Sequence, residues 1–129
     1  MPSDELREIA QKLVQYCREN NEEKGLGELY AEDAVSAEAA AMPGMDSAET
    51  KGLAGIRGKH EWWANAMEVH SASVDGPFYH GEDRFGVIFE VDATEKQSGK
   101  RNAMKELGVY TVAGGKIVRE EFFYGLDCG

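Results

Sequence analysis

The sequence predicts an α+β fold in which helices pack on one face of an antiparallel sheet. Helical spacing of apolar residues dominates the first half of the chain, and long alternating strand patterns separated by glycine turns dominate the second half. With 129 residues, the chain has the length of one domain, which we expect to span 1–129.

The first helix is predicted from apolar residues spaced three and four apart. Ser3 is a suitable N-cap for it, and the polar run that Gly25 closes predicts its end. A short second helix is indicated by Leu26 and Leu29. The stripe of the first helix consists of Leu6, Ile9, Ala10, Leu13, Val14 and Cys17.

A short strand over 34–38 follows, and then a loop over 39–51 that is rich in small residues. Alternation places Ser36 and Glu38 on the same face of this strand. Residues 52–67 return to helical spacing, and Ile56, His60 and Trp63 share one helix face.

The remaining chain reads as strands. Residues 68–75 form the first, which Gly76-Pro77 interrupts, and a second centres on the alternating segment FGVIFEVDA. Two more are expected over about 102–112 and over 116–124, joined by a Gly114-Gly115 hairpin.

Charge and composition exclude several classes of partner. The chain has 14 basic and 24 acidic residues, a net charge of −10, which makes nucleic acid and anionic membranes poor partners. No apolar run approaches the roughly 18 residues that span a bilayer, and the N-terminal segment lacks the apolar core of a signal peptide. We therefore expect a cytoplasmic protein, and its two distant cysteines predict neither a disulfide framework nor a zinc knuckle.

Three segments carry a family resemblance: LYAEDAVSAE, GLAGIRGKHEWW and VYTVAGGKIVREEFFY. Their order resembles the nuclear transport factor 2-like superfamily and, within it, the SnoaL-like proteins. The resemblance implies a curved sheet wrapped around the helices as a cone with a central pocket, and homodimers that pair through the sheet. The superfamily includes ketosteroid isomerases, polyketide cyclases, epoxide hydrolases, dehydratases and non-catalytic binding domains, so the fold alone does not choose a reaction.

Glu38 is the first candidate for catalysis. By resemblance it stands where ketosteroid isomerases carry the aspartate that abstracts a proton next to a carbonyl. The alternative is a solvated glutamate at the start of the loop. The likeness ends there, because Val14 and Leu107-Gly108 stand at the places of the oxyanion donors, and steroid isomerisation is not expected.

A second candidate set lies on the last two strands. The family pattern suggests that the face of Glu106 and Tyr110 and the face of Glu120, Phe122 and Tyr124 line the pocket. The alternative is that Glu106 and Glu120 pair across strands with Lys105, Arg119 or Arg101 on a solvated face.

The helix over 52–67 and the aromatic residues complete the candidate site. His60 is placed to assist as an acid or base, while Ile56, Trp63 and Phe89 are expected to form apolar contacts with a ligand. The histidines have neither HxH nor HxxxH spacing, so we expect no metal and no cofactor.

Two functions remain open at this stage. The first is a cofactor-independent isomerase, cyclase, dehydratase or hydrolase that acts on a small apolar or cyclic substrate, with Glu38 as base and His60, Tyr110 and Glu106 assisting. The second is a non-catalytic ligand-binding or structural dimerisation domain.

Overall fold

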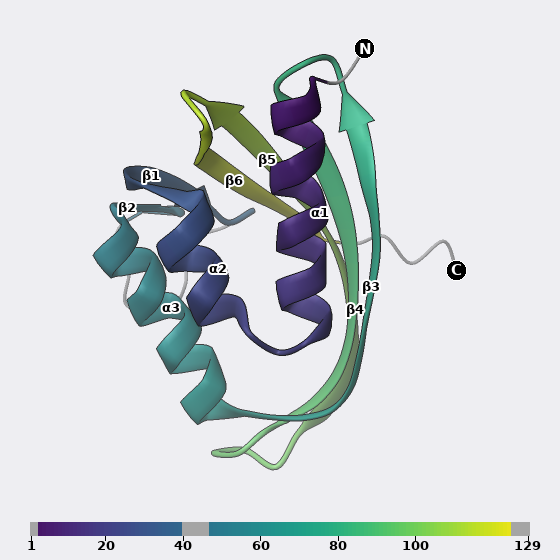
Figure 1. Ribbon diagram of the computed structural model, residues 1–129. Helices are drawn as coiled ribbons and strands as arrows, with labels where there is room; N and C mark the ends of the chain where they lie inside the picture. Colours follow the sequence, from purple (N-terminus) through teal and green to yellow (C-terminus); the bar gives the residue numbers. More distant parts are fainter. Residues whose placement is uncertain (1–2, 40–46, 125–129) are drawn as a thin grey trace.

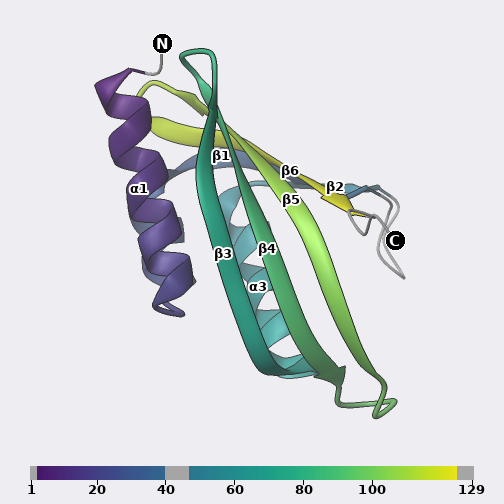
Figure 2. The ribbon, with the colours of Figure 1, turned by 90° about the vertical axis from the view of Figure 1, so that its right-hand side faces the viewer.

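A computed structural model describes residues 3–39 and 47–124. Its elements are α1 (Asp4–Arg18), α2 (Glu22–Leu29), β1 (Tyr30–Ala37), β2 (Glu49–Lys51), α3 (Leu53–Ala66), β3 (Met67–His80), β4 (Arg84–Glu95), β5 (Arg101–Ala113) and β6 (Lys116–Tyr124). The helices cover one side of a curved sheet that does not close on itself (Figures 1 and 2). The predicted α+β class is therefore confirmed.

The six strands form a single sheet with the order β2-β1-β6-β5-β4-β3. Four of the neighbouring pairs are antiparallel, but β1 pairs with β6 in parallel, which corrects the expectation of a wholly antiparallel sheet. The parallel pairing is possible because β1 and β6 are separated by most of the chain, which supplies the long connection that parallel neighbours need.

The core lies between α1 and the strands β4–β6. Leu6, on α1, and Phe85, on β4, are wholly buried in it. As predicted, the Ser3 side chain caps α1, accepting a hydrogen bond from the Leu6 amide at 3.1 Å. The apolar stripe thereby holds α1 across the concave face of the sheet, where Figure 2 also places α3.

Three boundaries differ from the sequence prediction. The first helix ends at Arg18, and Gly25 lies inside α2 rather than closing α1. A Cβ at Gly25 would lie 3.3 Å from the Tyr16 ring, so the glycine gives this ring room. Within the predicted loop, Glu49–Lys51 forms β2 against β1, while residues 40–46 lie outside the described part. Strand β3 continues through Gly76-Pro77, with a shift in register against β4 between Asp75 and Phe78.

Candidate functional site

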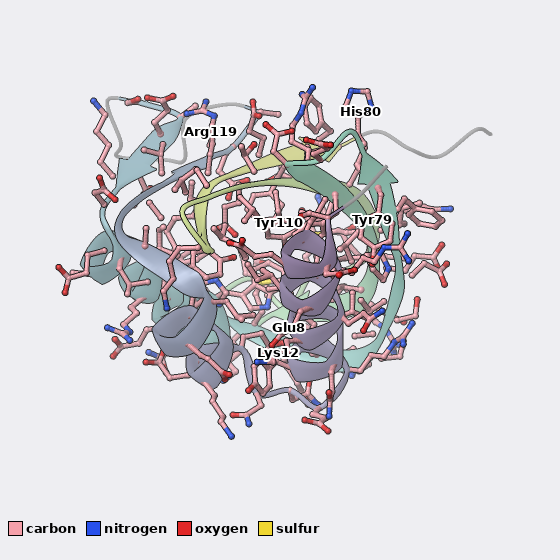
Figure 3. All side chains as sticks on the ribbon, turned by 45° about the horizontal axis from the view of Figure 1, so that its top comes forward. Glu8, Lys12, Tyr79, His80, Tyr110 and Arg119 are labelled. Carbon is pink, nitrogen blue, oxygen red and sulfur yellow. The ribbon has the colours of Figure 1, made fainter. Side chains whose placement is uncertain are left out.

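The candidate residues of β5 and β6 share the concave face of the sheet. Opposite each other across the two strands are Glu106 and Tyr124, Gly108 and Phe122, and Tyr110 and Glu120. Residues that pair directly point to the same side of a sheet. Figure 3 shows Tyr110 in the layer between α1 and the sheet. Both strands therefore present these side chains to the helices.

Glu120 is the most deeply buried charged residue of this face, with 2% of its surface exposed. The Tyr30 hydroxyl donates a hydrogen bond to its carboxylate, and the Ser36 side chain also lowers the pKa of Glu120. Burial nevertheless raises the pKa of Glu120, because removing a carboxylate from water disfavours its charged form.

The alternative interpretation of Glu106 and Glu120 as members of solvated ion pairs is wrong. Arg119 contacts Glu49 and Glu121, Lys105 contacts Glu90, and Arg101 contacts Asp92. These ion pairs lie on the other face of the sheet or at its edges, and none of them includes Glu106 or Glu120.

Glu38 lies at the rim of the same face, directly after β1. Its Oε1 is 2.7 Å from the Lys59 Nζ, and its Oε2 accepts a hydrogen bond from the Tyr124 hydroxyl. The side chain of Glu38 is 14% exposed.

The charges of both of these glutamates act on Glu106. Burial, and then the charges of Glu38 and Glu120, raise its pKa to about 7, while Lys59 opposes this effect. A carboxyl group with such a pKa is close to half protonated at neutral pH. The face thus carries two carboxyl groups in different surroundings: Glu38 contacts Lys59 and Tyr124, and Glu106 has a raised pKa.

Aromatic rings form the rest of the face. Tyr110 stacks on Phe85 with ring centroids 5.0 Å apart and meets Phe122 edge to face at 6.4 Å. A Cβ at Gly108 would lie 3.1–3.2 Å from the rings of Tyr110, Phe122 and Phe89. Glycine at this position therefore lets the three rings approach one another.

The candidates of α3 do not all join this group. Ile56 is wholly buried in the core, and Trp63 is half-buried two turns later. His60 is also half-buried, and burial, followed by the charge of Lys59, lowers its pKa. Within the described part of the chain, no hydrogen bond connects the His60 ring with Glu38, Glu106 or Glu120.

Sequence reasoning missed three members of the polar group: Tyr30, Ser36 and Lys59. Ser36 shares the predicted face of Glu38, and Lys59 lies three residues after Ile56 on the inward face of α3. A lysine at an inward position is a usable signal, because lysine is rarely buried without a partner. Tyr30 carried no such signal, because its partner Glu120 is 90 residues away.

Two of the hollows on the described surface have linings that include none of these carboxylates. One of about 600 Å³ lies between the end of α1 and the segment Val69–Val74 of β3. Another of about 380 Å³ lies between the end of α3, at Trp62, and the turn after β4. The central pocket at the carboxylate group therefore stays a prediction.

The fold and the order of its elements match a known family. The family model of the SnoaL-like domain matches residues 5–124. The chain belongs to the SnoaL-like family. A Mesorhizobium loti protein provisionally named a SnoaL-like polyketide cyclase is 36% identical to it, with a TM-score of 0.84 over 92% of this chain and 97% of the other.

More distant relatives share the fold alone. A Δ5-3-ketosteroid isomerase from Mycobacterium sp. is 15% identical, with a TM-score of 0.70 over 97% of this chain and 96% of that one. A Mycobacterium tuberculosis protein in complex with estradiol-17β-hemisuccinate is 16% identical, with a TM-score of 0.73 over 97% of both chains. Among curated proteins, none matches the sequence significantly. None of the described helices is both long and apolar enough to cross a membrane.

Proposed function

We propose that this SnoaL-like protein binds a small apolar or cyclic carbonyl compound at the concave carboxylate group and moves a proton within it, without a cofactor. The observation that carries the proposal is that one face of the sheet holds two glutamates, Glu38 and Glu106, in different surroundings. Glu38 contacts an ammonium and a phenol, which suits a carboxylate base, and Glu106 has a pKa near 7, which suits a donor.

In an isomerisation, Glu38 removes a proton from the carbon next to the carbonyl, and Glu106 donates a hydrogen bond to the oxygen on which charge develops. Glu38 then returns the proton to the far end of the new double-bond system, so no atom is gained or lost. Tyr110 and Phe122 provide apolar contacts for a cyclic substrate beside these groups. His60 remains a candidate for assistance, although it lies apart from the carboxylates.

Non-catalytic binding is the second candidate, and one observation favours it. Both oxygens of Glu38 are already occupied, one by Lys59 and the other by Tyr124, so a substrate has to displace at least one contact. A protein that only holds its ligand needs no such displacement.

The test combines turnover and binding. A β,γ-unsaturated cyclic ketone, 3-cyclohexenone, reports proton transfer through the absorbance of its conjugated product. We expect Glu38→Gln to lower the rate at least about a hundredfold, which is typical for loss of a general base. Glu28→Gln, which changes an exposed glutamate outside the face, should leave the rate unchanged.

Estradiol-17β-hemisuccinate, the ligand of the Mycobacterium tuberculosis relative, is a first binding probe for calorimetry. Binding of this probe without turnover of the ketone would support the non-catalytic candidate. A protein that neither binds the probe nor isomerises the ketone would contradict both candidates, and equal rates for Glu38→Gln and wild type would remove Glu38 as the base.

We also propose that the protein is a homodimer that pairs through the convex face of the sheet. Phe78 and Phe123 are 55% and 47% exposed, and they share this face with their strand partners Gly86 and Leu107. Exposed aromatic residues on one face are typical of an interface. Light scattering should give twice the 14.2 kDa of one chain, and the mass of a single chain would contradict the proposal.

A further inference from the structure

Lys59 is the cation at the centre of the carboxylate group. It belongs to the inward face of α3, and its side chain is only 17% exposed. Its Nζ lies 2.7 Å from the Glu38 Oε1 and donates a hydrogen bond to the Ser36 Oγ at 2.9 Å. The same ammonium lies 5.7 Å from the centroid of the Phe122 ring.

These contacts fix a side chain that is otherwise among the most mobile. Ordering a lysine side chain costs conformational entropy, and removing its charge from water costs more unless the charge is paired. Both costs are offset by three contacts of the ammonium, with the carboxylate of Glu38, the hydroxyl of Ser36 and the ring of Phe122. Lys59 therefore has one defined place, and so do the groups that contact it.

The order extends toward the interior through Ser36. The Ser36 oxygen accepts from Lys59, and the Ser36 side chain also acts on Glu120, whose pKa it lowers against the effect of burial. Tyr30 donates a hydrogen bond to the same carboxylate. Lys59 and Ser36 thus lie between Glu38 at the rim and the surroundings of the buried Glu120.

We propose that Lys59 is the positioning residue of the candidate site: it holds both the Glu38 carboxylate and the Ser36 hydroxyl in place. The inference rests on the proposed function in treating Glu38 as the working carboxylate. It adds that a helix, α3, places one oxygen of the base through Lys59, while the other oxygen contacts Tyr124 of β6.

The charges around Glu106 provide a way to detect this role. Lys59 lowers the pKa of Glu106, whereas Glu38 and Glu120 raise it. The charged or titratable groups that act on Glu106 or respond to it are Glu38, Lys59, Tyr110, Glu120 and Tyr124. Since Lys59 is the cation among them, its removal leaves the repulsion between the carboxylates without an offset.

The experiment is a titration of the glutamate carboxyl carbons by ¹³C NMR, together with a crystal structure of the variant. In Lys59→Met we expect the Glu106 midpoint to rise, since the charge of Lys59 opposes the increase in the pKa of Glu106. In the crystal, the Glu38 carboxylate should turn away from Ser36. Lys59→Arg keeps the charge and should restore the midpoint.

Lys12→Met is the matched control, because Lys12 also contacts two glutamates but lies on the exterior. It should leave the Glu106 midpoint unchanged. Should Lys59→Met fail to fold, Lys59→Gln keeps a donor without the charge, and the same rise is expected. An unchanged midpoint with Glu38 still in place would overturn the proposal. Since neither measurement involves turnover, the outcome is independent of whether Glu38 acts as a base.

Discussion

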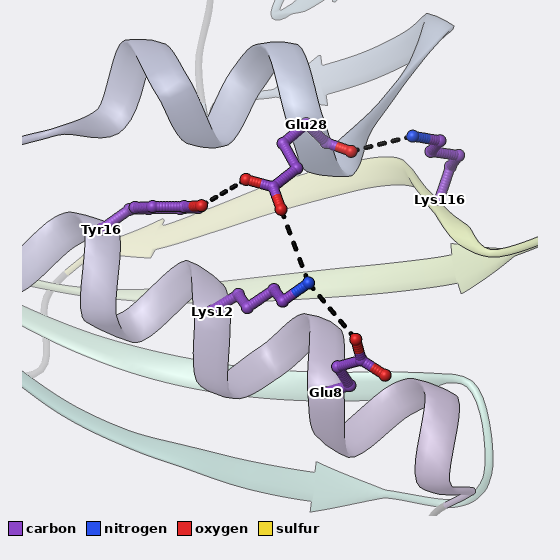
Figure 4. Close-up of polar contacts among 5 residues, drawn as sticks. All are labelled: Glu8, Lys12, Tyr16, Glu28 and Lys116. Carbon is purple, nitrogen blue, oxygen red and sulfur yellow. Dashed lines mark hydrogen bonds and ion pairs between the residues drawn. The ribbon is translucent and has the colours of Figure 1, made fainter.

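Tyrosine, glutamate and lysine form similar contacts in two regions of this protein, one exposed and one buried. On the exterior, Tyr16 donates to Glu28, and Lys12 contacts both Glu28, at 3.5 Å, and Glu8, at 3.2 Å (Figure 4). Lys116 joins the same region through the Glu28 carbonyl oxygen at 2.8 Å. These contacts connect α1, α2 and the start of β6.

In the interior, a tyrosine and a glutamate form the same contact, but the pKa of the glutamate shifts in the opposite direction. Tyr30 donates to Glu120 as Tyr16 donates to Glu28, yet the pKa of Glu28 is lowered, chiefly by the Tyr16 hydrogen bond, and that of Glu120 is raised by burial. A hydrogen bond favours the charged carboxylate in both places. The comparison teaches that burial outweighs the tyrosine hydrogen bond in setting the direction of the pKa shift of Glu120.

The largest expected effect is on the pH dependence of stability, and it concerns Glu106. Its pKa is about 7 in the folded state against 4.5 for the unperturbed group, so between these values the unfolded chain releases a proton that the folded chain keeps. The free energy of unfolding therefore decreases as the pH rises from 4.5 to 7, by about 3 kcal/mol for this group. Glu106→Gln should remove that decrease in urea denaturation across this range.

Glu28→Gln is the exterior counterpart. Because the pKa of Glu28 is lowered, its contribution is complete above pH 4.5 and is lost only as the pH falls below that value. The variant should therefore parallel the wild type between pH 4.5 and 7. Parallel curves for Glu106→Gln and wild type would show instead that Glu106 is as hydrated as Glu28.

A smaller effect is expected when the hydroxyl of the buried tyrosine is removed. Tyr30→Phe deprives Glu120 of one donor in a place that water does not reach, and we expect the free energy of unfolding at pH 7 to fall by about 2 kcal/mol. Urea denaturation at constant pH measures the change.

Tyr16→Phe makes the same chemical change on the exterior, where water can replace the hydroxyl as donor to Glu28. Its denaturation midpoint should not move. Equal losses of unfolding free energy in Tyr30→Phe and Tyr16→Phe would mean that water reaches the carboxylate of Glu120. The contrast between the buried and the exposed region would then be wrong.

The sequence was most informative where spacing alone sets the structure. The stripe of α1, its Ser3 cap and the strand 116–124 are local patterns, and the structure has each of them. The alternation that places Glu106 with Tyr110 is equally local. Gly25 was misread because a glycine that ends a helix and one that gives space to a neighbouring ring look alike in sequence.

Contacts between distant segments could not be read in the same way. The pairing of β1 with β6 is parallel and joins residues more than 80 positions apart, and Lys59 reaches Glu38 from a different element. Short-range spacing carries no information about which strand becomes a neighbour. Alternation along the chain therefore predicted which candidates share a strand face, but it carried no sign of the contacts of Lys59 with Glu38 and of Tyr30 with Glu120.

By itself, the sequence determined the fold class, the family and the residues that share each strand face, because the periods of helices and strands are properties of the local chain. The tertiary structure decided which carboxyl groups become buried, which lysine accompanies them and in which direction each pKa changes. Burial and charge act through space, so they depend on the packing of α3 and β1 against β5 and β6 and not on the order of residues along the chain.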